Sequence, residues 1–284
     1  MGLDIEYVVE ETALGTGGGI RNVYDKLRND TVMVFNGDVL SGMDLEGILT
    51  THHDKDADVT MHLLNVADPR AFGCVPTDSN GRVTAFLEKT EDPPTNQINA
   101  GCYVFKRSVI ESIPADRVVS VERETFPGLL ADGRLVVGHV DNSYWRDMGR
   151  PDDFTRGSSD LVRGIAPSPL IEGQTGESLV DPSAGIAGGV LLLSGTAVGR
   201  GSEVGAGSRL EGTVVFDGVR IEPGAIIHNS IIASGAHIGA NAVIENCVIG
   251  EGAHVGARCE LLDGMRVFPG VSIPDAGVRF SSDA

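Results

Sequence analysis

The chain has 284 residues, 41% of them hydrophobic, which is the composition of a globular protein that buries one large core or two smaller ones. It carries 40 acidic against 22 basic residues, a formal net charge of −18. This charge argues against nucleic acid or an anionic membrane surface as the main partner. We expect two domains, and an anionic substrate would need a bound cation or a few well-placed Lys and Arg side chains.

The first half of the chain alternates strand-like and helix-like segments, which predicts an α/β layer domain with a largely parallel sheet. We expect strands at residues 3–9, 32–35, 59–66, 83–87, 101–105 and 135–140. We expect helices at residues 20–27, 45–53, 109–112, 121–130 and 152–163, and a Gly-rich loop at 14–19. The strand at 32–35 is fully apolar, as in strands buried on both faces.

Composition changes at residue 164. Residues 164–185 are rich in Pro, Ser, Gly and acidic residues without periodicity, which predicts a linker or a lid. From Ile186 onward apolar residues recur about every six positions. We therefore place the domain boundaries at 1–163, 164–185 and 186–284.

The repeats after residue 186 also keep a 17-residue offset in three columns. These columns are Val198, Val215, Ile232 and Ile249; Val204, Ile221, Ile238 and Val255; and Leu210, Ile227, Ile244 and Leu261. A triangular prism of short parallel strands requires such columns, so we predict a hexapeptide-repeat parallel β-helix. Gly199, Gly205, Gly239, Gly250 and Gly256 follow inward residues, where we expect corners with backbone angles forbidden to most residues.

The cysteines and the first residues of the chain indicate in which cellular compartment the protein works. Four cysteines, Cys74, Cys102, Cys247 and Cys259, stand singly in apolar stretches without C-x-x-C spacing. Buried reduced thiols are therefore favoured over a zinc site or a disulfide framework. The first residues show no basic segment followed by an apolar run, and no later run approaches a membrane span. We predict a cytoplasmic protein.

Two aspartates follow or end predicted strands, Asp38 in Asn-Gly-Asp and Asp147 in Trp-Arg-Asp-Met-Gly. Ligands of open α/β sheets gather at the carboxyl ends of strands, where a carboxylate can hold a cation. Mg²⁺ suits such a site because it takes one or two carboxylates and completes its shell with water and substrate phosphates. The alternatives are a simple turn at Asp38 and a surface ion pair of Arg146 with Asp147.

The order of these motifs resembles the sugar-1-phosphate nucleotidyltransferases, most closely the mannose-1-phosphate guanylyltransferases of the β-helix type. Besides the two aspartates, the resemblance rests on Phe-Leu-Glu-Lys at 86–89, Phe-Gly at 72–73, Asn-Ala-Gly at 99–101 and the repeats that follow. It covers nearly the whole chain. It implies a Rossmann-like nucleotidyltransferase domain, incomplete at its N-terminus, followed by a left-handed parallel β-helix.

The resemblance also implies roles for individual residues. Asp38 and Asp147 would bind the metal and Lys89 the sugar-linked phosphate, and these three are the expected catalytic residues. The expected sugar-binding residues are Gly73, Glu88, Asn99 and Gly101. The expected nucleotide-binding residues, which would contact the nucleobase and ribose, are Leu14, Gly15, Thr16 and Gly17. Without the resemblance, Glu88 and Lys89 would more simply be solvated surface charges, and Gly73 and Gly101 bends in strands.

The implied reaction is nucleotidyl transfer from a nucleoside triphosphate, GTP by likeness, to a sugar 1-phosphate, mannose 1-phosphate by likeness. A glucose 1-phosphate enzyme that uses UTP, dTTP or ATP is the runner-up. The family's G-x-G-T-R loop, which holds the triphosphate, occurs nowhere in residues 1–284, and the Gly-rich residues 14–19 lack the pattern of a P-loop. We therefore expect a gapped catalytic domain with little transferase activity in this chain.

Two other functions stay open. One is a non-catalytic regulatory or assembly subunit, since β-helices commonly drive oligomerisation, and we expect a homo-oligomer formed through the β-helix. The other is a hexapeptide-repeat acyltransferase, because His237 and His254 lie 17 residues apart and should point outward, where such enzymes use a histidine as general base. The simpler interpretation of these histidines is an exposed ladder. His52 and His53 lie near three aspartates, which a polar helix end explains better than a metal site.

Overall fold

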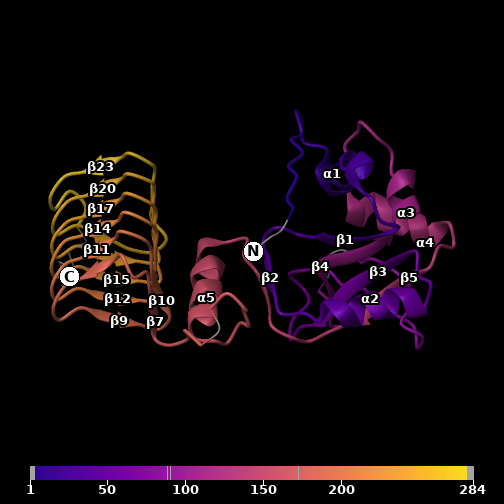
Figure 1. The fold of residues 1–284 in the computed structure, drawn as a ribbon, viewed down its shortest axis with the longest axis horizontal. Helices are drawn as coiled ribbons and strands as arrows, with labels where there is room; N and C mark the ends of the chain where they lie inside the picture. The colour runs from indigo at the N-terminus through magenta and orange to yellow at the C-terminus, as the bar shows by residue number, and fades with distance from the viewer. Residues whose placement is uncertain (1–3, 88, 90, 172, 280–284) are drawn as a thin grey trace. The chain divides into compact units, whose positions relative to one another are not determined.

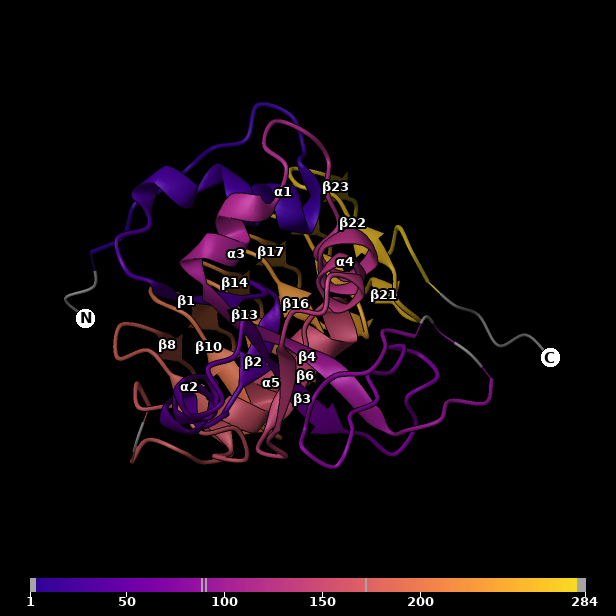
Figure 2. The same cartoon turned by 90° about the vertical axis from the view of Figure 1, so that its right-hand side faces the viewer.

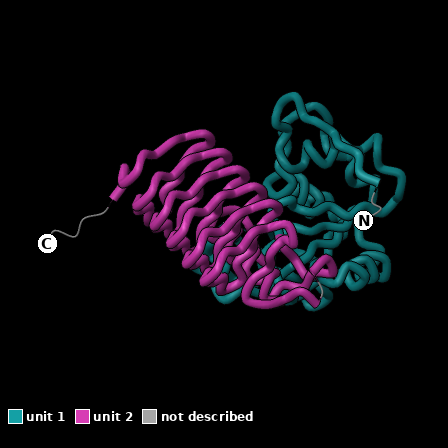
Figure 3. The backbone as a smooth tube through the Cα atoms, turned by 60° about the vertical axis from the view of Figure 1, so that its left-hand side comes forward, with its two compact units in different colours: residues 1–39, 43–145 teal, residues 40–42, 146–284 magenta. Residues whose placement is uncertain are grey.

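The protein is described by a computed structural model that covers residues 4–87, 89, 91–171 and 173–279. It divides into two compact units. Unit 1 comprises residues 1–39 and 43–145, and unit 2 comprises residues 40–42 and 146–284. Figure 3 colours unit 1 teal and unit 2 magenta.

Unit 1 is built on a four-stranded sheet in the order β1-β4-β3-β5 (Figure 1). The strands are β1 (Thr31–Phe35), β4 (Gln97–Lys106), β3 (Val59–Asn65) and β5 (Val136–Val140). β4 is antiparallel to both β1 and β3, whereas β3 and β5 are parallel. The described sheet is therefore mixed, and the prediction of a largely parallel sheet is wrong at β4.

Alternating side chains of β4 build two hydrophobic layers, because successive residues of a strand point to opposite faces. Tyr103 and Phe105 pack on one face with Phe126, whose ring centroid lies 5.1 Å from that of Tyr103. Cys102 and Val104 pack on the other face with residues of α2 (Leu45–Asp54). The sheet thus separates α2 from the helices α1 (Gly15–Asn22), α3 (Arg107–Ser112) and α4 (Phe126–Ala131).

Several predicted elements of unit 1 differ from the structure. Residues 4–10 are exposed and form no strand, although their pattern alternates; the exposed fraction of Tyr7 is 85%. Alternation predicts a strand only where a neighbouring strand supplies hydrogen bonds. Residues 83–87 pair through single bridges only. The strand β1 is half-buried rather than buried on both faces, and Phe35 is 55% exposed.

The helices also differ in detail. The predicted Gly-rich loop at 14–19 is the start of α1, which is followed by a short 3₁₀ turn, η1 (Tyr24–Lys26). The predicted helix 121–130 is a π-helix, η2 (Val121–Thr125), that continues into α4. The helices predicted at 45–53, 109–112 and 152–163 are confirmed to within two residues at each end by α2, α3 and α5 (Pro151–Val162).

Two short strands, β2 (Val39–Ser41) and β6 (Trp145–Asp147), pair with each other in a two-stranded sheet, and both are labelled in Figure 2. After β6, the chain continues into α5. The side chain of Arg146 contacts Asp160 of α5 at 3.0 Å. This ion pair fixes α5 relative to β6.

The rest of unit 2 is a β-helix of three parallel sheets. The first contains β7 (Ser178–Val180), β10 (Thr196–Val198), β13 (Val214–Val215), β16 (Ile231–Ile232), β19 (Val248–Ile249) and β22 (Arg266–Val267). The second contains β8 (Gly185–Ile186), β11 (Glu203–Val204), β14 (Arg220–Ile221), β17 (His237–Ile238), β20 (His254–Val255) and β23 (Ser272–Ile273). The third contains β9 (Leu191–Leu193), β12 (Arg209–Glu211), β15 (Ile226–His228), β18 (Val243–Glu245) and β21 (Glu260–Leu261). The first strand, β7, lies within the predicted linker.

The predicted three columns are confirmed. Val198 pairs with Val215, Val215 with Ile232 and Ile232 with Ile249, which is the 17-residue offset seen in the sequence. All twelve column residues are at most 3% exposed. They form one continuous core along the β-helix. The left-handed sense of the β-helix stays a prediction.

The reason given for the glycines after inward residues is wrong. Gly199, Gly205, Gly239, Gly250 and Gly256 are not among the glycines with positive φ. Instead, a Cβ atom on each would lie 2.4–2.6 Å from the neighbouring coil. In Gly239 that nearest atom is the backbone nitrogen of Ala257. These positions need glycine because the next coil passes too close for any side chain.

Candidate active site

A cavity of about 460 Å³ in unit 1 contains three of the residues predicted to handle the sugar phosphate. Its polar lining consists of Gly73, Lys89, Asn99, Glu122 and Arg123. Its apolar lining consists of Phe72, Cys74, Val75, Phe86, Leu87 and Pro127. The lining is therefore almost evenly divided between apolar side chains, which a ligand can pack against, and convergent polar groups, which can orient it.

Local pairing explains why Gly73 and Lys89 meet although they are distant in sequence. Cys74 and Leu87 exchange two backbone hydrogen bonds, each of 3.0 Å, in an antiparallel bridge. This bridge brings the residues on either side of it to one wall of the cavity. Gly73 has φ +77°, a conformation that favours glycine. Glu88 lies outside the described residues.

Asn99 is held by an internal network. Its Nδ2 donates to the Tyr103 hydroxyl at 2.7 Å and to Glu122 Oε1 at 2.7 Å, and its Oδ1 accepts the N–H of Gly101 at 3.1 Å. Burial raises the pKa of Tyr103, and the charge of Glu122 raises it further, whereas the bond to Asn99 opposes this. Tyr103 is therefore a neutral, fixed anchor for the Asn99 amide.

The π-helix η2 contributes Glu122 and Arg123, which the sequence analysis missed. Ser120 caps it: the Ser120 hydroxyl accepts the N–H of Arg123 at 3.2 Å, and Glu124 accepts the N–H of Ser120 at 3.0 Å. Ser120, directly before this segment, is a helix-start signal in the sequence, although Glu124 lies four residues later and not three. It does not signal the wider π turn, which is often found at functional sites.

Gly101 is not among the described residues that line the cavity. Its carbonyl accepts the N–H of Asn36 at 2.8 Å, and a Cβ atom on it would lie 2.8 Å from Asn36 Nδ2. Its φ is +79°. Gly101 therefore lets the Asn36-Gly37-Asp38 turn pack against β4, so the structure ties it to that turn and not to the cavity wall.

The Gly-rich start of α1 packs on the segment before η2. The N–H groups of Gly17 and Gly18 both donate to the carbonyl of Val119, at 2.8 and 3.3 Å. Val119 in turn donates to the carbonyl of Leu14 at 2.9 Å. A Cβ atom on Gly15 would lie 2.7 Å from the Val119 carbonyl oxygen. Because these N–H groups are already bonded, this helix start is a poor cradle for phosphate.

The two candidate metal ligands flank the paired strands β2 and β6. Asp38 directly precedes β2, and Asp147 is the last residue of β6. Both residues are exposed, and Asp147 Oδ1 accepts the N–H of Gly149 at 3.0 Å. Among the described residues no group of three or more His, Cys, Asp or Glu could hold a metal ion. Each of the two aspartates offers a hard carboxylate oxygen, the kind of ligand that Mg²⁺ accepts together with water and phosphate oxygens.

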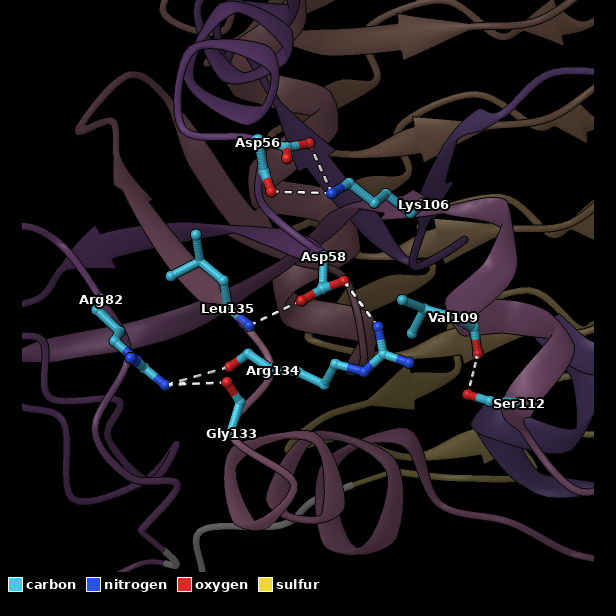
Figure 4. A network of polar contacts seen from close by, with 9 residues as sticks. All are labelled: Asp56, Asp58, Arg82, Lys106, Val109, Ser112, Gly133, Arg134 and Leu135. Atoms are coloured by element: carbon cyan, nitrogen blue, oxygen red, sulfur yellow. Dashed lines mark hydrogen bonds and ion pairs between the residues drawn. The ribbon is translucent and has the colours of Figure 1, made fainter.

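Two of the three aspartates near His52, Asp56 and Asp58, are engaged by basic side chains, as Figure 4 shows. Asp56 pairs with Lys106 at 2.7 Å. Asp58 accepts the N–H of Leu135 at 2.9 Å and pairs with Arg134 at 3.2 Å. These contacts connect the end of α2 with β4 and β5, so the cluster is accounted for by structural ion pairs.

His237 and His254 stack on adjacent coils with their rings 4.7 Å apart. Their Nδ1 atoms lie 3.1 Å apart, and His237 Nε2 lies 3.2 Å from Glu222 Oε1. Both are partly exposed beside the buried Ile238 and Val255. The predicted outward ladder is thereby confirmed. The four cysteines are free and buried, as predicted.

Known protein families match both the N-terminal and the C-terminal part of the chain. The profile of the nucleotidyl transferase family matches residues 1–164, and that of the GMPPB C-terminal domain matches residues 174–277. No helix within the described ranges has the length and apolar character needed to cross a membrane.

Three relatives illustrate how far the likeness extends. A mannose-1-phosphate guanylyltransferase of Mycobacterium tuberculosis is 66% identical over 284 residues, which is 100% of this chain and 79% of the relative. A mannose-1-phosphate guanyltransferase of Neurospora crassa is 34% identical, over 65% of this chain and 54% of the relative. Mannose-1-phosphate guanylyltransferase 1 of Arabidopsis thaliana is 36% identical, over 71% of this chain and 58% of the relative.

Among solved structures, HddC from Yersinia pseudotuberculosis matches with a TM-score of 0.49 and 25% identity, over 55% of this chain and 67% of that chain. The sequence likeness is stronger than this structural one. With a family match over residues 1–164 and a relative 66% identical along the whole chain, the protein belongs to the nucleotidyl transferase family.

Proposed function

We propose that the protein transfers a guanylyl group from GTP to mannose 1-phosphate, which yields GDP-mannose and pyrophosphate. The observation that carries this proposal is the cavity in which Gly73, Lys89 and Asn99 lie together. These are three of the residues for which a sugar-phosphate role was predicted. The relative that is 66% identical and is named for this reaction supports the choice of base and sugar.

In this reaction an oxygen of the sugar-linked phosphate attacks the α-phosphorus of the nucleotide. A new P–O bond forms, the bond from the α-phosphorus to the bridging oxygen breaks, and pyrophosphate leaves with that electron pair. The attacking oxygen is already ionised near neutral pH, so no general base is required. The protein must align two anions and neutralise their charge, and we assign Lys89 to the phosphate of mannose 1-phosphate.

We assign Asp38 and Asp147 to a Mg²⁺ ion. The pairing of β2 with β6 supports this, because Asp38 borders one strand and Asp147 ends the other. When bound, the ion supplies positive charge to the phosphate oxygens of the substrates. We assign residues 14–17 to the nucleobase and ribose, because the N–H groups of Gly17 and of the next residue, Gly18, are bonded to Val119 and are not available to phosphates.

The test is release of pyrophosphate from GTP and mannose 1-phosphate in the presence of Mg²⁺. We expect weak release, because residues 1–284 lack the G-x-G-T-R loop, and a further strong fall in Lys89→Met. Glucose 1-phosphate with UTP, dTTP or ATP should give less product. Higher activity with one of these pairs would replace GTP and mannose by the runner-up substrates. A chain that binds mannose 1-phosphate but releases no pyrophosphate would favour the non-catalytic subunit.

Two further features belong to this proposal. We propose a homo-oligomer formed through the β-helix, which sedimentation of the chain with and without the repeats of residues 186–284 would test. We also propose a reducing, cytoplasmic location, which the four buried free cysteines support. Thiol titration of the denatured protein under non-reducing conditions should count four free thiols.

A further inference from the structure

We infer that the carboxylate of Glu122 is a group of this cavity that accepts hydrogen bonds from the sugar hydroxyls, and that Asn99 positions it. This inference rests on the proposed function. It assigns a specificity-determining role to a residue that carried no role in the sequence analysis. Three observations support it: the bonds of Asn99, the place of Glu122 in the cavity, and the charges around it.

Asn99 has little capacity left for a ligand. Both hydrogens of its Nδ2 are engaged, one by the Tyr103 hydroxyl and one by Glu122 Oε1, each at 2.7 Å. Its Oδ1 already accepts the N–H of Gly101. An amide has two donor hydrogens only, so Asn99 cannot donate to a sugar without breaking this network. Its arrangement suits a residue that orients another side chain.

The anchor behind Asn99 is rigid. Tyr103 is 1% exposed and packs against the rings of both Phe105 and Phe126. Asn99 is therefore fixed at one end by a buried hydroxyl and presents its amide to Glu122 at the other. Glu122 itself is exposed and lines the cavity. One carboxylate oxygen is used by Asn99, which leaves Oε2 for a ligand.

The charged residues of the cavity suit different parts of a sugar 1-phosphate, its phosphate and its hydroxyl groups. Lys89 and Arg123 are cationic and suit a phosphate, whereas an ionised carboxylate accepts hydrogen bonds only and repels a phosphate. Glu122 is therefore unsuited to the phosphate end of a sugar 1-phosphate and suited to its hydroxyl groups. The aromatic residues Phe72 and Phe86 add apolar wall against which the C–H groups of a pyranose can pack.

A site built to accept from a hydroxyl discriminates against an analogue that lacks it, because the acceptor, once the bound sugar covers it, is then left unpaired. Glu122 would thus set which hexose 1-phosphate binds. Its effect should appear in the affinity for the sugar substrate and not in the affinity for a bare phosphate. This difference separates a contact with the sugar from a general effect of charge or folding.

The experiment measures equilibrium binding to the full chain by titration calorimetry, with mannose 1-phosphate and, separately, with inorganic phosphate. The variants are Glu122→Gln, which keeps an oxygen for Asn99, and Asn99→Ala, which removes the positioning contact. The matched control is Glu111→Gln, an exposed glutamate of α3 outside the cavity. Thermal unfolding of each variant checks that it is folded.

We expect Glu122→Gln to bind mannose 1-phosphate roughly tenfold more weakly, which is the loss when a charged acceptor becomes neutral. Inorganic phosphate should bind as well as or better than before, because a repelling charge is gone. Asn99→Ala should also weaken the binding of mannose 1-phosphate. Glu111→Gln should bind both ligands as the wild type does.

Unchanged mannose 1-phosphate affinity in a folded Glu122→Gln variant would overturn this inference and leave the proposed function intact. An equal loss for mannose 1-phosphate and inorganic phosphate would also overturn it, since the residue would then act on the phosphate or on folding. If the wild-type chain bound no hexose 1-phosphate at all, the proposed function and this inference would both fail.

Discussion

The hydroxyl of Thr16 accepts the backbone N–H of Val121 at 2.9 Å. This single bond joins the start of α1, where the nucleotide contacts are proposed, to the first residue of the π-helix whose next two residues line the cavity. The N–H of Gly17 reinforces the junction through the carbonyl of Val119 at 2.8 Å. The proposed nucleotide-binding and sugar-binding segments are therefore mechanically connected within unit 1.

Thr16→Val should destabilise the protein and disturb the cavity. The substitution keeps the shape of the side chain but leaves the N–H of the buried Val121 without a partner. An unsatisfied buried donor costs about 1–3 kcal/mol. Urea unfolding should show this loss. Thr50→Val, at an exposed position of α2, is the control and should unfold like the wild type; equal stability of both variants would contradict the proposed junction.

Gly101→Ala should be strongly destabilising, whereas Gly128→Ala should not. Residue 101 has φ +79°, and a Cβ atom there would press on the Asn36 side chain. Such backbone strain costs about 1–3 kcal/mol before any clash is added. Gly128 lies in α4 with open space around its Cα, so alanine there should stabilise by roughly 0.5–1 kcal/mol. Thermal unfolding of the two variants should shift in opposite directions.

Sequence periodicity predicted the β-helix well because each inward column residue has its partner 17 residues away. The pairing of Val198 with Val215 repeats along the chain, so one rule describes every coil. Unit 1 has no such repetition. Its strand β4 pairs with β1 and β3, which lie about 70 and 40 residues earlier in the chain. Both pairings are antiparallel, and the local sequence pattern of a strand does not reveal the direction in which it pairs.

The candidate site was partly predictable for a similar reason. Lys89 and Asn99 belong to short motifs, so the sequence marks them before the cavity is seen. Glu122 belongs to no such motif, and only the folded chain shows that it meets Asn99 across 23 residues of sequence. The glycines of the β-helix were recognised but explained wrongly, because the proximity of the next coil is a tertiary property.

Stability should fall as the pH is lowered from about 6.5 towards 4. Burial, aided by the charges of His53 and Lys106, lowers the pKa of His52 to about 4, while the unfolded histidine has its ordinary value of 6.5. Between these values the unfolded state binds a proton that the folded state does not, so acid favours unfolding. The loss from pH 7 to pH 5 should be about 2 kcal/mol for this residue.

His52→Asn should flatten that dependence in urea unfolding at pH 7, 6 and 5, since asparagine does not titrate. Some slope should remain, because burial also lowers the pKa of His62 and of His139. An unchanged slope in the variant would show that His52 is protonated in the folded protein.

Asp147→Asn and Asp38→Asn should each lower pyrophosphate release by roughly 100-fold, because a carboxylate that holds the cation loses its charge. The remaining activity should require more Mg²⁺ than the wild type. Asp25→Asn is the matched control, since Asp25 is an exposed residue of η1. Retention of full activity at low Mg²⁺ in Asp147→Asn would remove that residue from the metal site.

Gly239→Ala should destabilise the β-helix more than Gly235→Ala, although the two residues belong to the same coil. Gly235 has φ +67° but open space around it. Alanine there should lower the stability by about 1–2 kcal/mol, because it must adopt a left-handed backbone conformation, and no clash is added. Gly239 lacks positive φ, but its Cβ atom would lie 2.4 Å from the backbone nitrogen of Ala257. Backbone in a hydrogen-bonded coil cannot move aside cheaply, so the stacked strands would have to separate. Thermal unfolding followed by far-UV circular dichroism should rank the variants in this order, and the reverse order would restore the torsion-angle explanation of these glycines.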